Sequence, residues 1–146
     1  MDNAHIILVE DNRYDGEMIL DAISVNYMTD KVRVLRDGEQ ALDYFFGPEG
    51  CFRAATVHLP KLILLDLKLP KVSGLEFLKQ IRSDERTRYI PAVIFTSSNE
   101  AEDRIESYLL GANSFVVKPS DADIFSRVVT DIISYWISIN NVVYEN

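Results

Sequence analysis

Several short apolar runs of this sequence lead directly into polar residues whose types could do chemistry together. Glu10 and Asp11 follow one run, Asp66 follows a second, and Thr96 and Lys118 close two more. Three carboxylates within a few ångströms of one another would repel by about 4 kcal/mol per close pair at an effective dielectric constant of 20. Such a cluster needs a cation, and oxygen ligands with space for water favour Mg²⁺, whereas softer metals would need His or Cys ligands. The residue types therefore predict a magnesium site, provided that the fold brings the carboxylates together.

The elements that must position these residues are five apolar runs separated by segments of helical period, the pattern of repeated βα units. The predicted strands cover residues 5–9, 31–35, 62–65, 92–95 and 114–117. The predicted helices cover about 13–26, 38–46, 74–83, 100–110 and 121–139. Right-handed crossovers then give an α/β fold, a doubly wound five-stranded parallel sheet of flavodoxin-like order 2-1-3-4-5 with five helices.

Ligands bind this class of sheet outside the carboxyl ends of the strands, which is where the polar residues lie. Four of the runs are nearly all apolar and are predicted to be covered on both faces, whereas the alternation in 31–35 suits an edge strand. The connection at 47–60 contains Gly and Pro and is interpreted as a surface loop. We expect a single domain over residues 1–146, with a short C-terminal tail after about residue 138.

Composition and charge exclude several functional classes. A net charge of -8 with scattered Lys and Arg opposes direct binding to nucleic acids. A single cysteine cannot form an internal disulfide, and the N-terminus does not have the pattern of a signal peptide. The most apolar stretch, 124–139, is interrupted by Arg127 and Asp131, so no membrane span is predicted and a cytoplasmic location is expected.

The ordered set of residues at the strand ends resembles the response-regulator receiver family over essentially the whole chain. The matching residues are Glu10-Asp11, Asp66-Leu67-Lys68-Leu69-Pro70 with Gly74, Thr96, and Lys118-Pro119. The loop at 47–60 and the segments 64–67, 69–71 and 111–114 look most like single-domain regulators that serve phytochrome-type histidine kinases. The resemblance implies two-component signalling, in which a histidine kinase is the partner and the regulator becomes a phosphoprotein.

The resemblance also implies a role for each carboxylate. Asp66 is the implied phosphoacceptor, which takes the phosphoryl group from a phosphohistidine or a small acyl phosphate. Asp11 and Asp66 are the implied direct Mg²⁺ ligands, and Glu10 acts largely through water. The main-chain carbonyl of Lys68 is implied to complete the protein's share of the ligands.

Other matched residues are implied to contact the phosphoryl group or to respond to it. Thr96 and Lys118 should contact phosphoryl oxygens, and a lysine point charge can offset charge on a transferring phosphoryl group. The Lys118–Pro119 peptide bond is implied to be cis. Movement of Thr96 is implied to couple to Phe115, which lacks the hydroxyl of the tyrosine often found there, so that only steric coupling is expected.

Lys68 departs from the family pattern, because similar proteins often carry a shorter or neutral polar side chain two residues past the acceptor. We hypothesise that its ammonium lies near the phosphoryl pocket and changes the lifetime of the phosphorylated state.

Taken one at a time, the same residues have ordinary structural interpretations. Asp11 or Asn12 could cap the first helix, Thr96 could be a strand-end hydroxyl, and Lys118 could be a solvated charge before a turn-forming proline. The two histidines and the cysteine are isolated, and structural roles are expected for them. Only the ordered set favours a shared function.

Two alternatives to a phosphorylation switch stay open. The first is a small phosphatase or phosphotransferase that uses Asp66 as a covalent nucleophile on outside substrates. Such an enzyme would ordinarily need a second carboxylate as general acid, and position 68 offers Lys instead. The second is an unphosphorylated adaptor of the same fold, which the intact acidic set disfavours. A switch would catalyse only its own phosphorylation and dephosphorylation.

The last predicted helix carries an apolar band wider than one core-facing stripe requires. Its members are Ile124, Phe125, Val128, Val129, Ile132, Ile133, Trp136 and Ile137. The band predicts either a deeply packed helix or, together with Tyr135, a surface for a partner or a homodimer.

Overall fold

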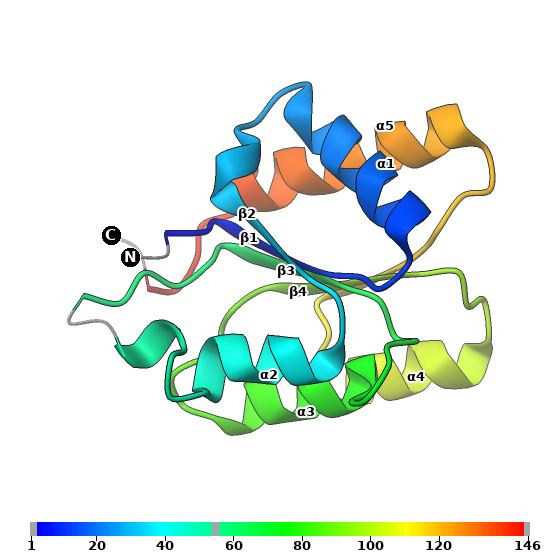
Figure 1. The fold of residues 1–146 in the computed structure, drawn as a ribbon. Coiled ribbons are helices and arrows are strands. Elements are labelled where there is room, and N and C mark those ends of the chain that lie inside the picture. The colour runs from blue at the N-terminus through cyan, green and yellow to red at the C-terminus, as the bar shows by residue number, and fades with distance from the viewer. Residues whose placement is uncertain (1–2, 54–55, 145–146) are drawn as a thin grey trace.

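A computed structural model describes residues 3–53 and 56–144, which form one five-stranded parallel sheet between two layers of helices (Figure 1). The strands are β1 (Ile6–Val9), β2 (Val32–Leu35), β3 (Leu62–Leu65), β4 (Ala92–Thr96) and β5 (Ser114–Val117). They pair in the order β2-β1-β3-β4-β5, and every pairing is parallel. The predicted fold class and strand order are therefore confirmed.

Five helices connect and cover the strands. α1 (Arg13–Ser24) and α5 (Ala122–Ile133) lie side by side on one face of the sheet, and α2 (Gly38–Phe46), α3 (Gly74–Ser83) and α4 (Ala101–Leu109) lie on the other (Figure 1). Short 3₁₀ turns at Thr29–Lys31 and Cys51–Arg53 interrupt two connections. The right-handed crossovers expected for parallel strands account for this two-layer arrangement.

Side-chain caps fix where most of these helices begin. Asn12, Asp37, Ser73 and Asp121 each accept a hydrogen bond from a backbone N–H in the first turn of the following helix. These caps satisfy donors that would otherwise be orphaned at a helix N-terminus. All four of these capped helices follow a loop at the carboxyl end of a strand, so the caps also set the geometry of those loops.

The core consists of two apolar clusters, one on each face of the sheet. Alternate residues of β1 show the division: Ile7 and Val9 pack with α2 and α3, whereas Ile6 and Leu8 pack with α1 and α5. All four side chains are at most 1% exposed. Burial on both faces explains why the sequences of the inner strands are continuous apolar runs.

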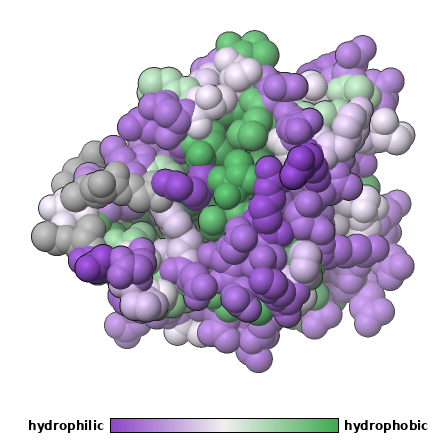
Figure 2. Space-filling view, in the orientation of Figure 1, coloured by the Kyte–Doolittle hydropathy of each residue, from purple (hydrophilic) through white to green (hydrophobic). Residues whose placement is uncertain are grey.

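The two edge strands differ from one another and partly from the prediction. β2 alternates between half-buried and exposed positions before its buried last residue, as the alternating sequence predicted. Figure 2 shows the apolar side chains that gather along this open edge, between the helical layers. β5 was predicted to be covered on both faces, and that prediction is wrong: its first three residues are half-buried and Val117 is exposed, because β5 is the other edge of the sheet.

The final helix continues past α5 as a π-helical segment, Ser134–Ile139. Within the apolar band, Phe125, Val129, Ile132 and Ile133 are buried against the sheet, whereas Ile124 stays exposed. The chain then turns back, so that Val142 is buried and the Tyr144 hydroxyl donates a hydrogen bond to the Pro60 carbonyl. Deep packing therefore accounts for about half of the band.

Residues 145–146 of the predicted tail lie outside the described residues. No helix of the described chain is both long and apolar enough to span a membrane.

Candidate functional site

The candidate site lies at the carboxyl ends of β1, β3 and β5, where the strand order reverses beside β1. Backbone hydrogen bonds between strands fix the first residue of each loop: the Asp66 N–H donates to the Val9 carbonyl at 3.0 Å and the Lys118 N–H to the Thr96 carbonyl at 2.7 Å. The Glu10 N–H donates to the carboxyl-terminal residue of β2 at 3.0 Å. The sheet therefore continues for one residue past each strand and holds these side chains at a common edge.

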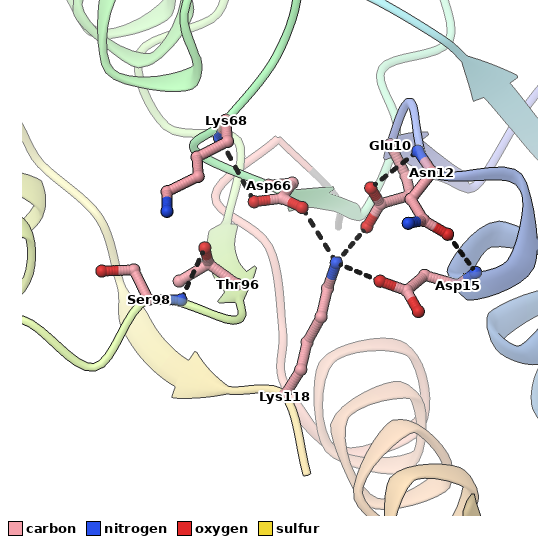
Figure 3. Close-up of polar contacts among 8 residues, drawn as sticks. All are labelled: Glu10, Asn12, Asp15, Asp66, Lys68, Thr96, Ser98 and Lys118. Atoms are coloured by element: carbon pink, nitrogen blue, oxygen red, sulfur yellow. Dashed lines mark hydrogen bonds and ion pairs between the residues drawn. The ribbon is translucent and has the colours of Figure 1, made fainter. Parts of the chain in front are cut away.

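Lys118 joins three carboxylates into one cluster (Figure 3). Its ammonium lies 2.6 Å from Glu10 Oε1, 2.8 Å from Asp15 Oδ2 and 2.9 Å from Asp66 Oδ2. The Lys118 side chain is only 6% exposed, and those of Glu10 and Asp66 are 1% and 9% exposed. Charge-assisted hydrogen bonds of this length are the strong kind, and their burial limits screening by salt.

Burial and charge shift the pKa values within this cluster. Burial, and after it the neighbouring Asp66 charge, raise the pKa of Glu10 from 4.5 to about 7, against the lowering effect of Lys118. Burial alone would lower the pKa of Lys118, but hydrogen bonds to Asp15, Asp66 and Glu10 raise it above its ordinary value. Lys118 therefore remains a cation at physiological pH and counters part of the negative charge around it.

Asp15 is a member of this cluster that sequence reasoning missed. It lies in the first turn of α1, and its own N–H donates to the Asn12 side chain that caps the helix. An acidic residue three positions after a cap is a common feature of helix N-termini, so the sequence pattern indicates capping and a favourable helix dipole rather than a site. Only the approach of Lys118, 103 positions away in the chain, shows the contact.

Asp11 does not join the cluster. It is exposed and lies outside the set of carboxylates that contact Lys118. Among residues 3–53 and 56–144, no group of three Asp, Glu, His or Cys side chains is arranged so that it could hold a metal ion as it stands. The donor chemistry nevertheless fits a hard cation, because Glu10 and Asp66 supply carboxylate oxygens that already surround a positive charge.

Lys68, Thr96 and Ser98 lie on the far side of Asp66 from Asp15 (Figure 3). The Lys68 N–H donates to Asp66 Oδ1 at 3.3 Å, and Lys118 binds the other oxygen, so both oxygens of this carboxylate have partners. Lys68 is exposed. The Thr96 side chain is fully buried, and its hydroxyl oxygen accepts the Ser98 N–H at 3.3 Å. Ser98 in turn donates to Asp103 of α4 at 2.5 Å. Thr96 is therefore linked to the start of α4 rather than to the carboxylates.

Phe115 is half-buried in β5 and packs against the core cluster on the α2 and α3 face of the sheet. Its N–H donates to the Tyr108 hydroxyl of α4 at 3.2 Å. The backbone of Phe115 is thus hydrogen-bonded to α4, the helix that follows Thr96 in the chain.

The Lys118–Pro119 peptide bond is trans, as are all peptide bonds of the described residues, so the predicted cis bond is wrong. A trans bond is favoured intrinsically by about 0.5–1 kcal/mol even before proline. It also lets the Lys118 side chain reach all three carboxylates, so the geometry of the site does not require the cis form.

Close backbone contacts hold the loop after Asp66 in place. A Cβ atom on Gly74 would lie 2.2 Å from the Asp66 carbonyl oxygen, and one on Gly38 would lie 1.9 Å from the Val72 carbonyl oxygen. The Gly74 N–H donates to the Leu67 carbonyl at 3.0 Å. Glycine at 38 and 74 therefore lets the starts of α2 and α3 press against this loop, which fixes the position of Asp66.

Comparisons with known proteins agree with this geometry. A sequence model described as "Response regulator receiver domain" matches residues 6–129. The probable methanogenesis regulatory protein FilR2 of Methanothrix harundinacea is 41% identical over 135 residues, which cover 92% of this chain and 84% of that protein. Response regulator Rcp1 of Synechocystis is 33% identical and covers 90% of this chain and 88% of its own length.

Solved structures give the same result. The phosphorylated cyanobacterial phytochrome response regulator RcpA superimposes with a TM-score of 0.84 at 35% identity, covering 94% of this chain and 96% of that one. The Mn²⁺-bound form of Rcp1 superimposes with a TM-score of 0.82 at 31% identity, with 94% and 96% covered.

Proposed function

The chain belongs to the response regulator receiver domain family, and from that premise we propose that it accepts a phosphoryl group on Asp66 from a histidine kinase. It is a receiver domain of two-component signalling. The observation that carries the assignment of Asp66 is its place in the cluster: a carboxylate at a strand end, 9% exposed and 2.9 Å from the Lys118 ammonium. The comparisons give no support to a phosphatase acting on outside substrates.

The residues around Asp66 can assist the transfer without covalent roles of their own. Lys118 carries a buried positive charge that can offset negative charge on the transferring group. The Thr96 hydroxyl lies at the neighbouring strand end, where a contact with a phosphoryl oxygen would compete with the hydrogen bond from Ser98. Phosphorylation in this proposal draws Thr96 away from the start of α4 and lets Phe115 shift, which changes the surface presented to a partner.

A divalent cation belongs to this proposal, and we take it to be Mg²⁺. Receiver domains bind a divalent metal, and the Rcp1 structure contains Mn²⁺. Glu10, Asp11, Asp66 and the Lys68 carbonyl are the residues that would hold the ion, with Asp11 turning inward from its exposed position. A bound Mg²⁺ would neutralise charge on the phosphoryl oxygens.

Phosphotransfer from a purified phytochrome-type histidine kinase tests the proposal. Wild type should be labelled with Mg²⁺ and remain unlabelled in EDTA, whereas Asp66→Asn should remain unlabelled throughout. Asp43→Asn removes an exposed aspartate of α2 and should be labelled like wild type. Full labelling of Asp66→Asn would falsify the assignment of the acceptor. Turnover of a phosphomonoester such as p-nitrophenyl phosphate would instead favour an enzyme that acts on outside substrates.

Phytochrome-type kinases are the proposed source of the phosphoryl group because the structural neighbours include phytochrome response regulators. A panel of kinases tests this choice: transfer from a phytochrome-type kinase should be faster than from an unrelated histidine kinase at equal concentrations.

Lys68 is proposed to set the lifetime of the phosphorylated state. Its side chain extends from the Asp66 loop toward the side of Thr96 and Ser98 (Figure 3), and its N–H already contacts Asp66. The dephosphorylation rates of wild type and Lys68→Asn test this role, with Lys79→Asn on α3 as an exposed control. Identical dephosphorylation rates for Lys68→Asn and wild type would contradict this role of Lys68.

Self-association through the last helix is the final part of the proposal. Ile124 of α5, together with Tyr135 and Ile139 of the π-helical segment, remains exposed at 45%, 47% and 63%. Exposed apolar side chains of this size favour association when they lie together. Sedimentation at several concentrations, with and without phosphorylation, would show a dimer, whereas a strict monomer in both states would count against it.

A further inference from the structure

The Lys118 ammonium uses all of its hydrogen-bonding capacity on the three carboxylates. A lysine ammonium has three donors, and Glu10, Asp15 and Asp66 supply one acceptor oxygen each. The three acceptors come from separate places in the chain: the ends of β1 and β3, and the first turn of α1. If one carboxylate is lost as an acceptor, the ammonium therefore keeps charged hydrogen-bond partners only at the other two.

Two of these three acceptors belong to the proposed phosphorylation chemistry, and Asp15 does not. Phosphorylation of Asp66 forms an acyl phosphate, whose carboxyl oxygens are no longer charged and are weaker acceptors for Lys118, while the negative charge lies on the phosphoryl oxygens instead. Glu10 is a proposed contact of the divalent cation and would be shared with it. Asp15 is then the one carboxylate of the three that remains fully available to Lys118.

The first turn of α1 holds Asp15 in a fixed position for this contact. The Asp15 N–H donates to Asn12 Oδ1 at 2.9 Å, and the Asn12 N–H donates to Glu10 Oε2 at 3.2 Å. These bonds connect the backbone of Asp15, through Asn12, to the Glu10 side chain at the end of β1. The Asp15 side chain is 23% exposed, so it meets the ammonium from the solvent side of the cluster. In Figure 3 it approaches Lys118 from α1, on the opposite side from Lys68 and Thr96.

We propose that Asp15 is a positioning residue for Lys118, which anchors the ammonium from the α1 side and so leaves Glu10 and Asp66 accessible to a cation and a phosphoryl group. This inference rests on the proposed function. Without Asp15, Lys118 has only Glu10 and Asp66 as charged acceptors and binds both of them more closely. A divalent cation then competes harder for those oxygens, and after phosphorylation of Asp66 no acceptor in α1 holds the ammonium in place beside the phosphoryl oxygens.

Cation affinity provides a readout that does not depend on phosphorylation. Mn²⁺ binding, followed by the paramagnetic resonance signal of the free ion, should weaken about tenfold in Asp15→Asn, the lower end of what a hydrogen bond to a charged group contributes. Asp15→Glu should restore most of the affinity. Glu17→Gln removes the same charge from the exposed face of α1 and provides the matched control.

A double-mutant cycle separates positioning of Lys118 from a general loss of negative charge. In a Lys118→Met background, Asp15→Asn should weaken Mn²⁺ binding no more than Glu17→Gln does, because no ammonium remains to be anchored. An equally large effect with and without Lys118 would show that Asp15 acts only through its charge and would overturn the inference. Thermal unfolding checks that each variant folds, and Asp15→Ser is measured in parallel in case Asp15→Asn does not.

Labelling of Asp66 by acetyl phosphate at saturating Mg²⁺ completes the test. Wild type should be labelled, and Asp15→Asn should be labelled about tenfold more slowly, as expected from the same lost bond. If wild type is not labelled, the proposed function fails. If wild type is labelled and Asp15→Asn matches it in both rate and Mn²⁺ affinity, only the role of Asp15 fails.

Discussion

Replacing Lys118 with methionine should reveal how strongly the acidic cluster depends on its internal cation. Methionine keeps most of the apolar stem and removes the ammonium, which leaves Glu10, Asp15 and Asp66 without their shared counter-charge. The free energy of unfolding should therefore fall when no divalent cation is present.

The magnitude follows from the geometry. Opposite unit charges at the 2.9 Å that separate Lys118 from Asp66 attract by roughly 6 kcal/mol at an effective dielectric constant of 20. The cost of removing a 6% exposed ammonium from water offsets much of this attraction. Because breaking a buried ion pair typically costs about 3–5 kcal/mol, we expect Lys118→Met to lose about 3 kcal/mol. In urea this corresponds to a midpoint lowered by roughly 1.5 M.

The stability that Lys118→Met loses should also depend on pH. The pKa of Glu10 is raised from 4.5 to about 7 in the folded protein, so protonation of Glu10 favours folding. This contribution is fully present below about pH 4.5 and disappears as the pH rises through 7. Without Lys118 the Glu10 pKa should rise further, so the deficit of the variant should be larger at pH 8 than at pH 6.

Urea denaturation of wild type, Lys118→Met and the exposed control Lys79→Met, in EDTA at pH 6 and pH 8, provides the assay. Addition of Mg²⁺ should stabilise Lys118→Met more than wild type, since the ion no longer competes with an ammonium. If Lys118→Met were as stable as wild type in EDTA at both pH values, the cluster would not need its lysine, and this electrostatic account would be wrong.

Four further substitutions, one of them a matched control, test the backbone and its supports. Gly38→Ala should lower the free energy of unfolding by more than about 2 kcal/mol, because the new Cβ would lie 1.9 Å from the Val72 carbonyl oxygen. Gly16→Ala is the matched change, since its nearest contact is a flexible arginine at 3.3 Å, and it should be neutral or stabilising by up to about 1 kcal/mol. Lys71→Gly should raise stability by up to about 1 kcal/mol, because Lys71 has a φ of 68°, and a thermal melt would show the gain. Arg82→Met should cost about 2–3 kcal/mol in urea denaturation, since its guanidinium donates to two carbonyls and to a side-chain amide.

Local patterns in the sequence were enough to predict the fold. Each strand lies within one residue of its predicted run, and α2 and α3 have the predicted bounds. Periodicity identified the elements because buried strands and amphipathic helices differ in their apolar spacing, and the crossover rule for parallel strands then left few topologies. The same reasoning placed Glu10, Asp66 and Lys118 at one edge of the sheet, where the structure brings them together.

Only the tertiary structure decided which side chains meet within that edge. Asp11 is adjacent in sequence to Glu10 yet remains exposed, whereas Asp15 enters the cluster from the first turn of α1. The burial of β5, the trans bond before Pro119 and the return of Val142 to the core also escaped sequence reasoning. Spacing along the chain determines which element a residue belongs to, but the direction of a side chain and its distance to a lysine 103 positions away depend on how the elements pack.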